Sequence, residues 1–457
     1  MAAGDGTSFG ILKFGPSKAA TYVTRPLRRA AALASLSLLS LTAALHPWIA
    51  AGAYGLVAVG GVFITGGPAF QLLSTYADRQ QGRLRTLVSL SLMGAALSSL
   101  IGTLGLPVSV FVATMLTLGF GDLGRRLLLE TRPDRIWGVS GFVLFGTIAA
   151  FLGQLGVVAS RDVLRPALVP EALFLAASAA LLGALLRSVM LDRNDPLVLA
   201  MVSLLLWLFA DVAVAVGSQQ IVVALILTAL LGYISYVLET ASIPGMLTGV
   251  FLSLLAVVLG GYGWFLVLLA FFGVGGLATK FRYEEKLERG VAEPNEGARG
   301  TGNVLGNSLA ALIALILFAA HPRTPLPGET FLFAFAGSVA TALGDTLSSE
   351  IGGLFDRPRL ITSLSPVEAG TDGAVTWQGE IAGVAGAGVI ALLSELFFGL
   401  GAVGIAVVVL GGVAGMTADS LAGATVEGAL IGNQHVNIIA TTVGAVTGGA
   451  LYLVFLA

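Results

Sequence analysis

Cysteine is absent from this sequence, and histidine and charged residues are scarce. Without cysteine there is no disulfide, no thiolate nucleophile and no cysteine-ligated metal. Of the three histidines, His46 and His321 each precede a proline between apolar segments, so we do not expect a histidine-ligated zinc site. Charged residues make up 11% of the chain and the net charge is −2, whereas soluble domains carry about 25% charged residues. These values favour neither a nucleic-acid partner nor an acidic substrate.

Long apolar runs fill most of the chain instead. Hydrophobic residues make up 56% of the 457 residues, and the mean hydropathy is +0.92. Unpaired strands cannot cross lipid, so the sequence predicts an all-α, polytopic, multi-pass integral membrane protein, in the cell membrane if the source is prokaryotic. About fifteen segments are long enough to span a bilayer: 30–46, 48–65, 86–103, 105–121, 137–158, 170–187, 197–216, 219–238, 243–260, 261–279, 303–320, 330–349, 380–397, 399–418 and 436–456.

The distribution of basic residues predicts the orientation of these spans. If the N-terminus is cytoplasmic, all but three of the 24 Lys and Arg residues fall in inner segments. The exceptions are Arg161, Arg165 and Arg323. The positive-inside rule predicts such an asymmetry. The inner loops are also the long, polar ones, so we expect function at the cytoplasmic face.

The chain divides into a cytoplasmic segment, 1–29, and two transmembrane units, 30–195 and 196–457. A possible internal repeat relates the units, because each contains a helix that we expect to end in Gly-Asp, at Asp122 and at Asp345. The alternative is coincidence, since small residues and Asp commonly end helices.

Polar residues gather after the second Gly-Asp. Asp345, Ser349 and Glu350 lie within two helical turns, and residues four apart share a helix face. Hard oxygen ligands of this kind suit Mg²⁺. The alternative is a helix end with solvated charges, which costs little at the cytoplasmic interface.

A glycine-rich loop, 370–376, precedes the next span. Its glycines permit conformations in which several N–H groups point at one anion, so the loop is a candidate phosphate site. A plain tight turn explains it equally well.

The most charged stretch, 280–289, is typical of a solvated helix face, on which Arg282 and Lys286 would share one side.

The next span carries Asn303 and Asn307, four residues apart, and Asn433 and Asn437 repeat this spacing. Buried amides need partners, so these pairs mark helix contacts or a site.

Small residues four apart predict close helix contacts at three places. The pairs are Gly245/Gly249, Gly411/Gly415 and Gly444/Gly448.

From about residue 225 to 457 the chain resembles the domain-of-unknown-function 92 family, also called the transmembrane protein 19 family. The resemblance rests on several segments in the family's order and spacing, which are Phe271-Phe272 with Thr279-Lys280, Arg299 to Asn307, Ala340 to Gly352, Gly370 to Gly373, Gly379, Asp419 to Gly423, and Val436-Asn437. Two departures are Ala374-Val375-Thr376 in place of Gly-Val-Ser and Leu347-Ser348 in place of Trp-Ala. The first half resembles a diverged polyprenol-kinase unit, and because its Gly138-Val139-Ser140-Gly141 lacks a Glu, we expect it to be non-catalytic.

That family includes the plastid phytyl-phosphate kinase and is related to the phytol and dolichol kinases. The resemblance implies phosphoryl transfer from a nucleotide, first of all CTP and otherwise ATP, to a prenyl phosphate or prenol. It implies that Asp345, Glu350 and Asp419 form the catalytic, Mg²⁺-binding set. It further implies that Lys280, Arg282 and Arg299 neutralise nucleotide phosphates, that Gly370, Thr371 and Gly373 cradle one phosphate, and that Asn303, Asn307 and Asn437 orient the acceptor.

Two other classes of function remain open. Repeated halves and interrupted helices are typical of transporters, although Asp211 and Glu395, the acids nearest mid-membrane, lie toward the outer ends of their spans. A proton-coupled carrier would be expected to hold an acid at the midplane. A non-catalytic scaffold is the third class, and it predicts that the cytoplasmic acids are dispensable.

Overall fold

A computed structural model describes residues 16–161, 168–190, 194–212, 217–293, 300–428 and 430–457. These residues are almost entirely helical, which confirms the predicted all-α, polytopic architecture. The chain forms two compact units. Unit 1 comprises Met1–Leu164 and Leu175–Trp207, and unit 2 comprises Arg165–Phe174 and Leu208–Ala457.

Unit 1 is built mainly from the first nine α-helices and one 3₁₀ helix. They are α1 (Pro16–Ser37), the 3₁₀ helix η1 (Leu38–Ala44), α2 (Pro47–Phe63), α3 (Gly67–Leu73), α4 (Tyr76–Gln81), α5 (Arg85–Thr103), α6 (Val108–Thr131), α7 (Arg135–Arg161), α8 (Leu168–Val189) and α9 (Asp195–Val212). The axis bends by 115° between α2 and α3. Buried side chains concentrate on α6, which packs against α1, α5 and α7.

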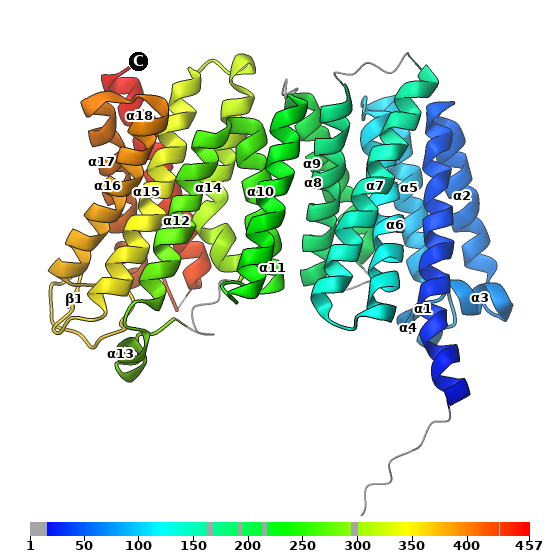
Figure 1. Cartoon of the computed structure of the whole chain (residues 1–457), viewed down its shortest axis with the longest axis horizontal. Helices are drawn as coiled ribbons and strands as arrows, with labels where there is room; N and C mark the ends of the chain where they lie inside the picture. Colours follow the sequence, from blue (N-terminus) through cyan, green and yellow to red (C-terminus); the bar gives the residue numbers. More distant parts are fainter. Residues whose placement is uncertain (1–15, 162–167, 191–193, 213–216, 294–299, 429) are drawn as a thin grey trace, which may run out of the picture. The chain divides into compact units, whose positions relative to one another are not determined.

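Unit 2 contains the remaining elements. They are α10 (Ser218–Val237), α11 (Ile243–Leu255) with the π-helix η3 (Ala256–Gly260), α12 (Tyr262–Lys280), α13 (Tyr283–Glu288), α14 (Thr301–Ala319), η5 (His321–Arg323), α15 (Gly328–Gly352), the paired strands β1 (Arg359–Leu360) and β2 (Ala374–Val375), α16 (Trp377–Phe398), α17 (Gly401–Thr425) and α18 (Asn433–Phe455). Within this unit, α13 and β1 lie at the end opposite the C-terminus (Figure 1). The positive-inside rule assigns that end to the cytoplasm.

Thirteen of the described helices are long and apolar enough to span a bilayer, or fourteen if α2 and α3 together form one span. The prediction of about fifteen spans differs only near the N-terminus. There the segment predicted at 30–46 is the end of α1 followed by η1, and the segment predicted at 48–65 is the 17-residue α2. Length and composition therefore locate the spans well, except where a helix is short or irregular.

Helix α15 lies at the centre of unit 2, where it packs against α12, α14, α16, α17 and α18. Glycines allow the close approach of α17 and α18. A Cβ at Gly337 of α15 would lie 2.5 Å from the carbonyl oxygen of Gly444, and one at Gly448 would lie 2.5 Å from that of Phe333. The predicted close contacts at Gly411/Gly415 and Gly444/Gly448 are thus confirmed. The prediction for Gly245/Gly249 is not met at Gly249, where a Cβ would meet nothing within 4 Å.

Asp78 fixes the short helix α4 at the membrane interface of unit 1. Its carboxylate accepts from the backbone N–H groups of Thr75 (2.9 Å) and Thr86 (3.1 Å), and the Thr75 hydroxyl accepts from the Asp78 N–H. Burial alone would raise the pKa of Asp78, but these hydrogen bonds outweigh it and lower the pKa below 3.8.

We therefore expect Asp78→Asn to lower the thermal unfolding temperature at pH 7, with a loss of about 1–2 kcal/mol. Because the folded-state pKa is depressed, the stabilisation is present above pH 3.8 and is lost as the pH falls through the folded-state pKa. The difference between the variant and wild type should therefore shrink below that pH. Asp134→Asn, at an exposed loop position, is the control, and an equal loss in both variants would contradict the assignment.

Candidate functional site

A polar cavity of about 160 Å³ opens at the cytoplasmic end of unit 2. Four spans and the segment after α13 contribute to it together with the end of α12. Its lining residues are Thr279, Glu293, Asn303, Asn307, Asp345, Thr346, Ser349, Glu350, Asp419, Asn433 and Asn437. Acids, amides and hydroxyls make up this wall, and no Lys or Arg lines it within the described part of the chain. The cavity is therefore rich in hydrogen-bond acceptors and negative charge.

Six of the predicted site residues meet in this cavity. Asp345 and Glu350 come from α15, Asp419 from α17, Asn303 and Asn307 from α14, and Asn437 from α18. The other predicted residues lie elsewhere. Lys280 and Arg282 are exposed, Gly370, Thr371 and Gly373 belong to the loop between β1 and β2, and Arg299 lies outside the described residues.

The acids Asp345 and Asp419 lie next to each other in the cavity wall. Their side chains lie within hydrogen-bonding reach, although neither carboxylate can donate unless it is protonated. Oδ1 of Asp419 is buried and receives no hydrogen bond from any residue that the structure describes. Two like charges at this separation repel strongly, so the pair requires a shared proton or a bound cation.

Two more acids, Glu380 and Glu427, add to the negative potential, and neither was predicted from the sequence. Glu380 and Glu427 interact electrostatically with Asp345. Glu427, in the loop after α17, has its pKa raised by burial and by the neighbouring Asp372. Their position in the sequence could have identified them, because each of these acids lies at the cytoplasmic end of its segment, where the spans of unit 2 converge.

Glu350 is paired with a lysine. Nζ of Lys286, on α13, donates to Oε2 of Glu350 at 2.5 Å and to the carbonyl oxygens of Thr279 and Ala278 at 2.6 and 3.1 Å. Lys286 is only 1% exposed. The expectation of a solvated helix with Arg282 and Lys286 on one face is therefore wrong. Arg282 precedes α13 and pairs with Glu285, while Lys286 turns into the bundle.

The buried amides bond along their own helices. Nδ2 of Asn307 donates to the carbonyl oxygen and to Oδ1 of Asn303 at 3.0 and 3.2 Å, and Nδ2 of Asn437 donates to Oδ1 of Asn433 at 3.3 Å. Both amides thus bond within their own helices while lining the cavity. These hydrogen bonds do not join two helices.

The loop at Gly370–Gly373 is a tight turn that rests on α17. The N–H of Ala374 donates to the carbonyl of Thr371 at 3.0 Å, so it is committed within the turn. Gly373 has a φ of +73°, and a Cβ there would lie 2.5 Å from the carbonyl oxygen of Ser420. Both the left-handed backbone and the close approach therefore require glycine. None of the loop's three predicted phosphate-binding residues lines the cavity.

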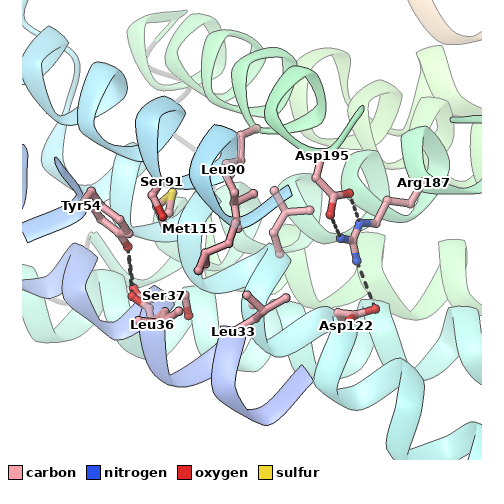
Figure 2. A pocket seen from close by; sticks show the side chains of 14 residues that line it. Leu33, Leu36, Ser37, Tyr54, Leu90, Ser91, Met115, Asp122, Arg187 and Asp195 are labelled. Carbon is pink, nitrogen blue, oxygen red and sulfur yellow. Dashed lines mark hydrogen bonds and ion pairs between the residues drawn. The ribbon is translucent and has the colours of Figure 1, made fainter. Parts of the chain in front are cut away.

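Unit 1 contains a different arrangement around Asp122. Arg187 lies between two acids, with one ion pair to Asp122 at 3.2 Å and a bidentate pair to Asp195 (Figure 2). Arg125 also bonds Asp122, at 3.0 Å. Asp122, Arg187 and Asp195 line a small, mainly apolar cavity of about 30 Å³. In unit 1 arginines thus pair with Asp122, whereas no Lys or Arg lines the cavity around Asp345 and Asp419 in the described part of unit 2.

Neither Asp122 nor Asp345 ends its helix, contrary to the expectation. Helix α6 continues to Thr131 and α15 to Gly352. Both carboxylates therefore project from regular helix within a bundle, where side chains of neighbouring helices reach them.

Comparison with known proteins places this site within a family. The profile of the family "Integral membrane protein DUF92" matches residues 226–448. The uncharacterized membrane protein MJ0933 of Methanocaldococcus jannaschii is 40% identical over 197 residues, which are 42% of this chain and 77% of that protein. The uncharacterized membrane protein sll0875 of Synechocystis is 35% identical over 192 residues, 40% of this chain and 72% of that protein.

A plant relative matches over a shorter stretch. The chloroplastic protein VTE6 of Arabidopsis thaliana is 34% identical over 125 residues, which are 27% of this chain and 38% of that protein. No solved structure matches. The matched region contains the whole cavity of unit 2, and the chain belongs to the DUF92 family of integral membrane proteins.

Proposed function

We propose that unit 2 is a membrane-embedded phosphotransferase that moves the γ-phosphoryl group of a nucleotide, CTP or ATP, to a prenyl phosphate or prenol at the cytoplasmic interface. The observation that carries the proposal is the pair Asp345 and Asp419 in a polar cavity at the end of a lipid-embedded bundle. Such a place suits a substrate with a charged head and an apolar tail. The resemblance to a family that includes the phytyl-phosphate kinase supports the same chemistry.

The donor set of the cavity fits a divalent cation. Mg²⁺ usually takes one or two carboxylates and completes its shell with water and phosphate, so Asp345 and Asp419 suffice as protein ligands. The buried, unpartnered Oδ1 of Asp419 is an oxygen that a cation would satisfy. No cluster of three His, Cys, Asp or Glu side chains forms a closed metal cage in the described part of the chain. When bound there, Mg²⁺ would offset the negative charge of the nucleotide phosphates.

Phosphoryl transfer depends mainly on positioning and charge neutralisation. An oxygen of the acceptor forms a bond to the γ-phosphorus while the bond to the bridging oxygen breaks and the nucleoside diphosphate leaves. With a prenol as acceptor, the hydroxyl proton passes to a carboxylate, and we assign this role to Asp345. Asn303, Asn307 and Asn437 are the proposed acceptor-orienting groups, since they line the same cavity. Lys280 follows the lining residue Thr279, so it is the predicted phosphate ligand best placed to act from the rim.

Transport of a lipid or small solute is the rival function. The 115° bend between α2 and α3 and the π-helix at the end of α11 are interruptions of the kind found in transporters. A carrier would move substrate across the membrane of proteoliposomes without any change in the covalent structure of the substrate.

The test is transfer of labelled γ-phosphate from CTP and from ATP to prenyl phosphates and prenols, using protein in nanodiscs with Mg²⁺. Label in the lipid product supports the proposal and identifies the preferred pair. If folded protein labels no acceptor while proteoliposomes show flux of an unmodified lipid, the transporter replaces it.

A further inference from the structure

Lys286 is a fully buried cation beside a cavity whose walls carry only acids and neutral polar groups. Its ammonium has three acceptors, namely Oε2 of Glu350 and the last carbonyls of α12 at Ala278 and Thr279. The carbonyl end of a helix attracts positive charge. Lys286 is thus held by fixed partners on two different helices.

The segment around Lys286 is tied down as well. The N–H of Val291 donates to the carbonyl of Lys286 at 3.0 Å, and the hydroxyl of Tyr283 donates to the carbonyl of Glu293 at 2.9 Å. Arg289 pairs with Asp356 at 2.9 Å, which joins this segment to the chain after α15. The position of the ammonium is therefore set by folded structure rather than by a free side chain.

We propose that Lys286 is a positioning residue that neutralises Glu350 and so reserves the pair Asp345 and Asp419 for the cation. This inference rests on the cation site of the proposed function and assigns a division of labour within it. Glu350 then acts on the cavity only through its pairing with Lys286 and is not itself a cation ligand. This differs from the role that the family resemblance implies for Glu350.

The charges predict opposite effects for the two partners. Without Lys286, the Glu350 carboxylate is unpaired and adds one negative charge to the cavity, which strengthens cation binding. Without the Glu350 charge, the Lys286 ammonium is unpaired and repels the cation. At effective dielectric constants of about 20, each change alters the affinity roughly tenfold. Removing both charges restores the original net charge of the Lys286–Glu350 pair, which is zero.

The experiment measures Mn²⁺ affinity by electron paramagnetic resonance in detergent, without nucleotide or lipid substrate. Lys286→Met should bind Mn²⁺ roughly tenfold more tightly than wild type and Glu350→Gln roughly tenfold more weakly. The double variant should return to within about twofold of wild type. Arg323→Met removes the cation of the exposed pair with Asp211, and it should leave the affinity unchanged.

The double variant decides the matter even if a single variant fails to fold, because replacing a buried ion pair by neutral groups is commonly tolerated. If Glu350 were a cation ligand, the double variant would bind Mn²⁺ much more weakly than wild type, and the inference would be overturned. Wild-type protein that binds no Mn²⁺ would also overturn it. Neither result depends on catalysis, so failure of the transferase proposal is seen separately, as missing transfer by protein that binds Mn²⁺.

Discussion

Asp345→Asn is expected to lower the rate of phosphoryl transfer by on the order of 10²–10³-fold or more, a loss typical of removing one electrostatic stabiliser from a reaction centre. The reason is the position of Asp345 beside Asp419 in the cavity, where we propose that both carboxylates hold one cation. An amide is a neutral and weaker ligand. The rate constant should be measured in nanodiscs with the nucleotide and lipid that wild type prefers.

The same substitution should not destabilise the protein. An asparagine at 345 can donate a hydrogen bond to the Asp419 carboxylate and removes the repulsion between two acids, so the unfolding temperature should equal or exceed that of wild type. Asp211→Asn is the control, because Asp211 is 66% exposed and pairs with Arg323 rather than with the cavity. Full transfer activity in folded Asp345→Asn would remove Asp345 from the mechanism.

Gly415→Val is expected to destabilise unit 2 by about 1–3 kcal/mol or more, as overpacking of a tight core does. Gly415 lies where Thr341 of α15 fits between α17 and α18, and an added Cβ would lie 2.8 Å from the carbonyl oxygen of Ala440. The Thr341 hydroxyl already donates to the carbonyl of Gly337 at 2.9 Å and has no room to withdraw. Thermal unfolding in detergent should show a lower midpoint and a reduced yield of folded protein.

Gly388→Val is the matched control within the same unit. It lies in α16, and a Cβ there would meet nothing within 4 Å. The unfolding temperature of this variant should stay close to that of wild type, because the difference in helix propensity between valine and glycine is small compared with the cost of a packing clash. Equal stability of the two variants would show that the glycine seam between α15, α17 and α18 does not limit packing.

Much of the fold follows from sequence because lipid imposes a simple rule on it. Spans must be long and apolar, and basic loops stay in the cytoplasm. The same rule gathers polar residues from distant segments at one interface, which is why Asp345, Asp419 and Asn437 could be placed near one another from sequence. The helix ends were harder to predict from sequence, since α15 continues past Asp345 to Gly352.

The pairing of Lys286 with Glu350 could not be predicted from sequence. The two residues are 64 positions apart, and α13 starts only at Tyr283, so helical spacing from Arg282 gives the wrong face. The ion pairs of Arg187 with Asp122 and Asp195 in unit 1 are equally hard to predict, because Arg187 and Asp122 meet only when α8 packs near α6. Long-range ion pairs of this kind depend on tertiary packing, which no local pattern encodes.

The most direct test of the central claim is Mg²⁺-dependent transfer of labelled γ-phosphate to a prenyl lipid by wild-type protein and by Asp345→Asn, measured in the same nanodiscs. The account predicts labelled lipid from wild type with Mg²⁺, none after chelation, and transfer by the folded variant that is slower by on the order of 10²-fold or more. Transfer by the variant at the wild-type rate, or no transfer with any nucleotide and acceptor by folded wild-type protein, would contradict it.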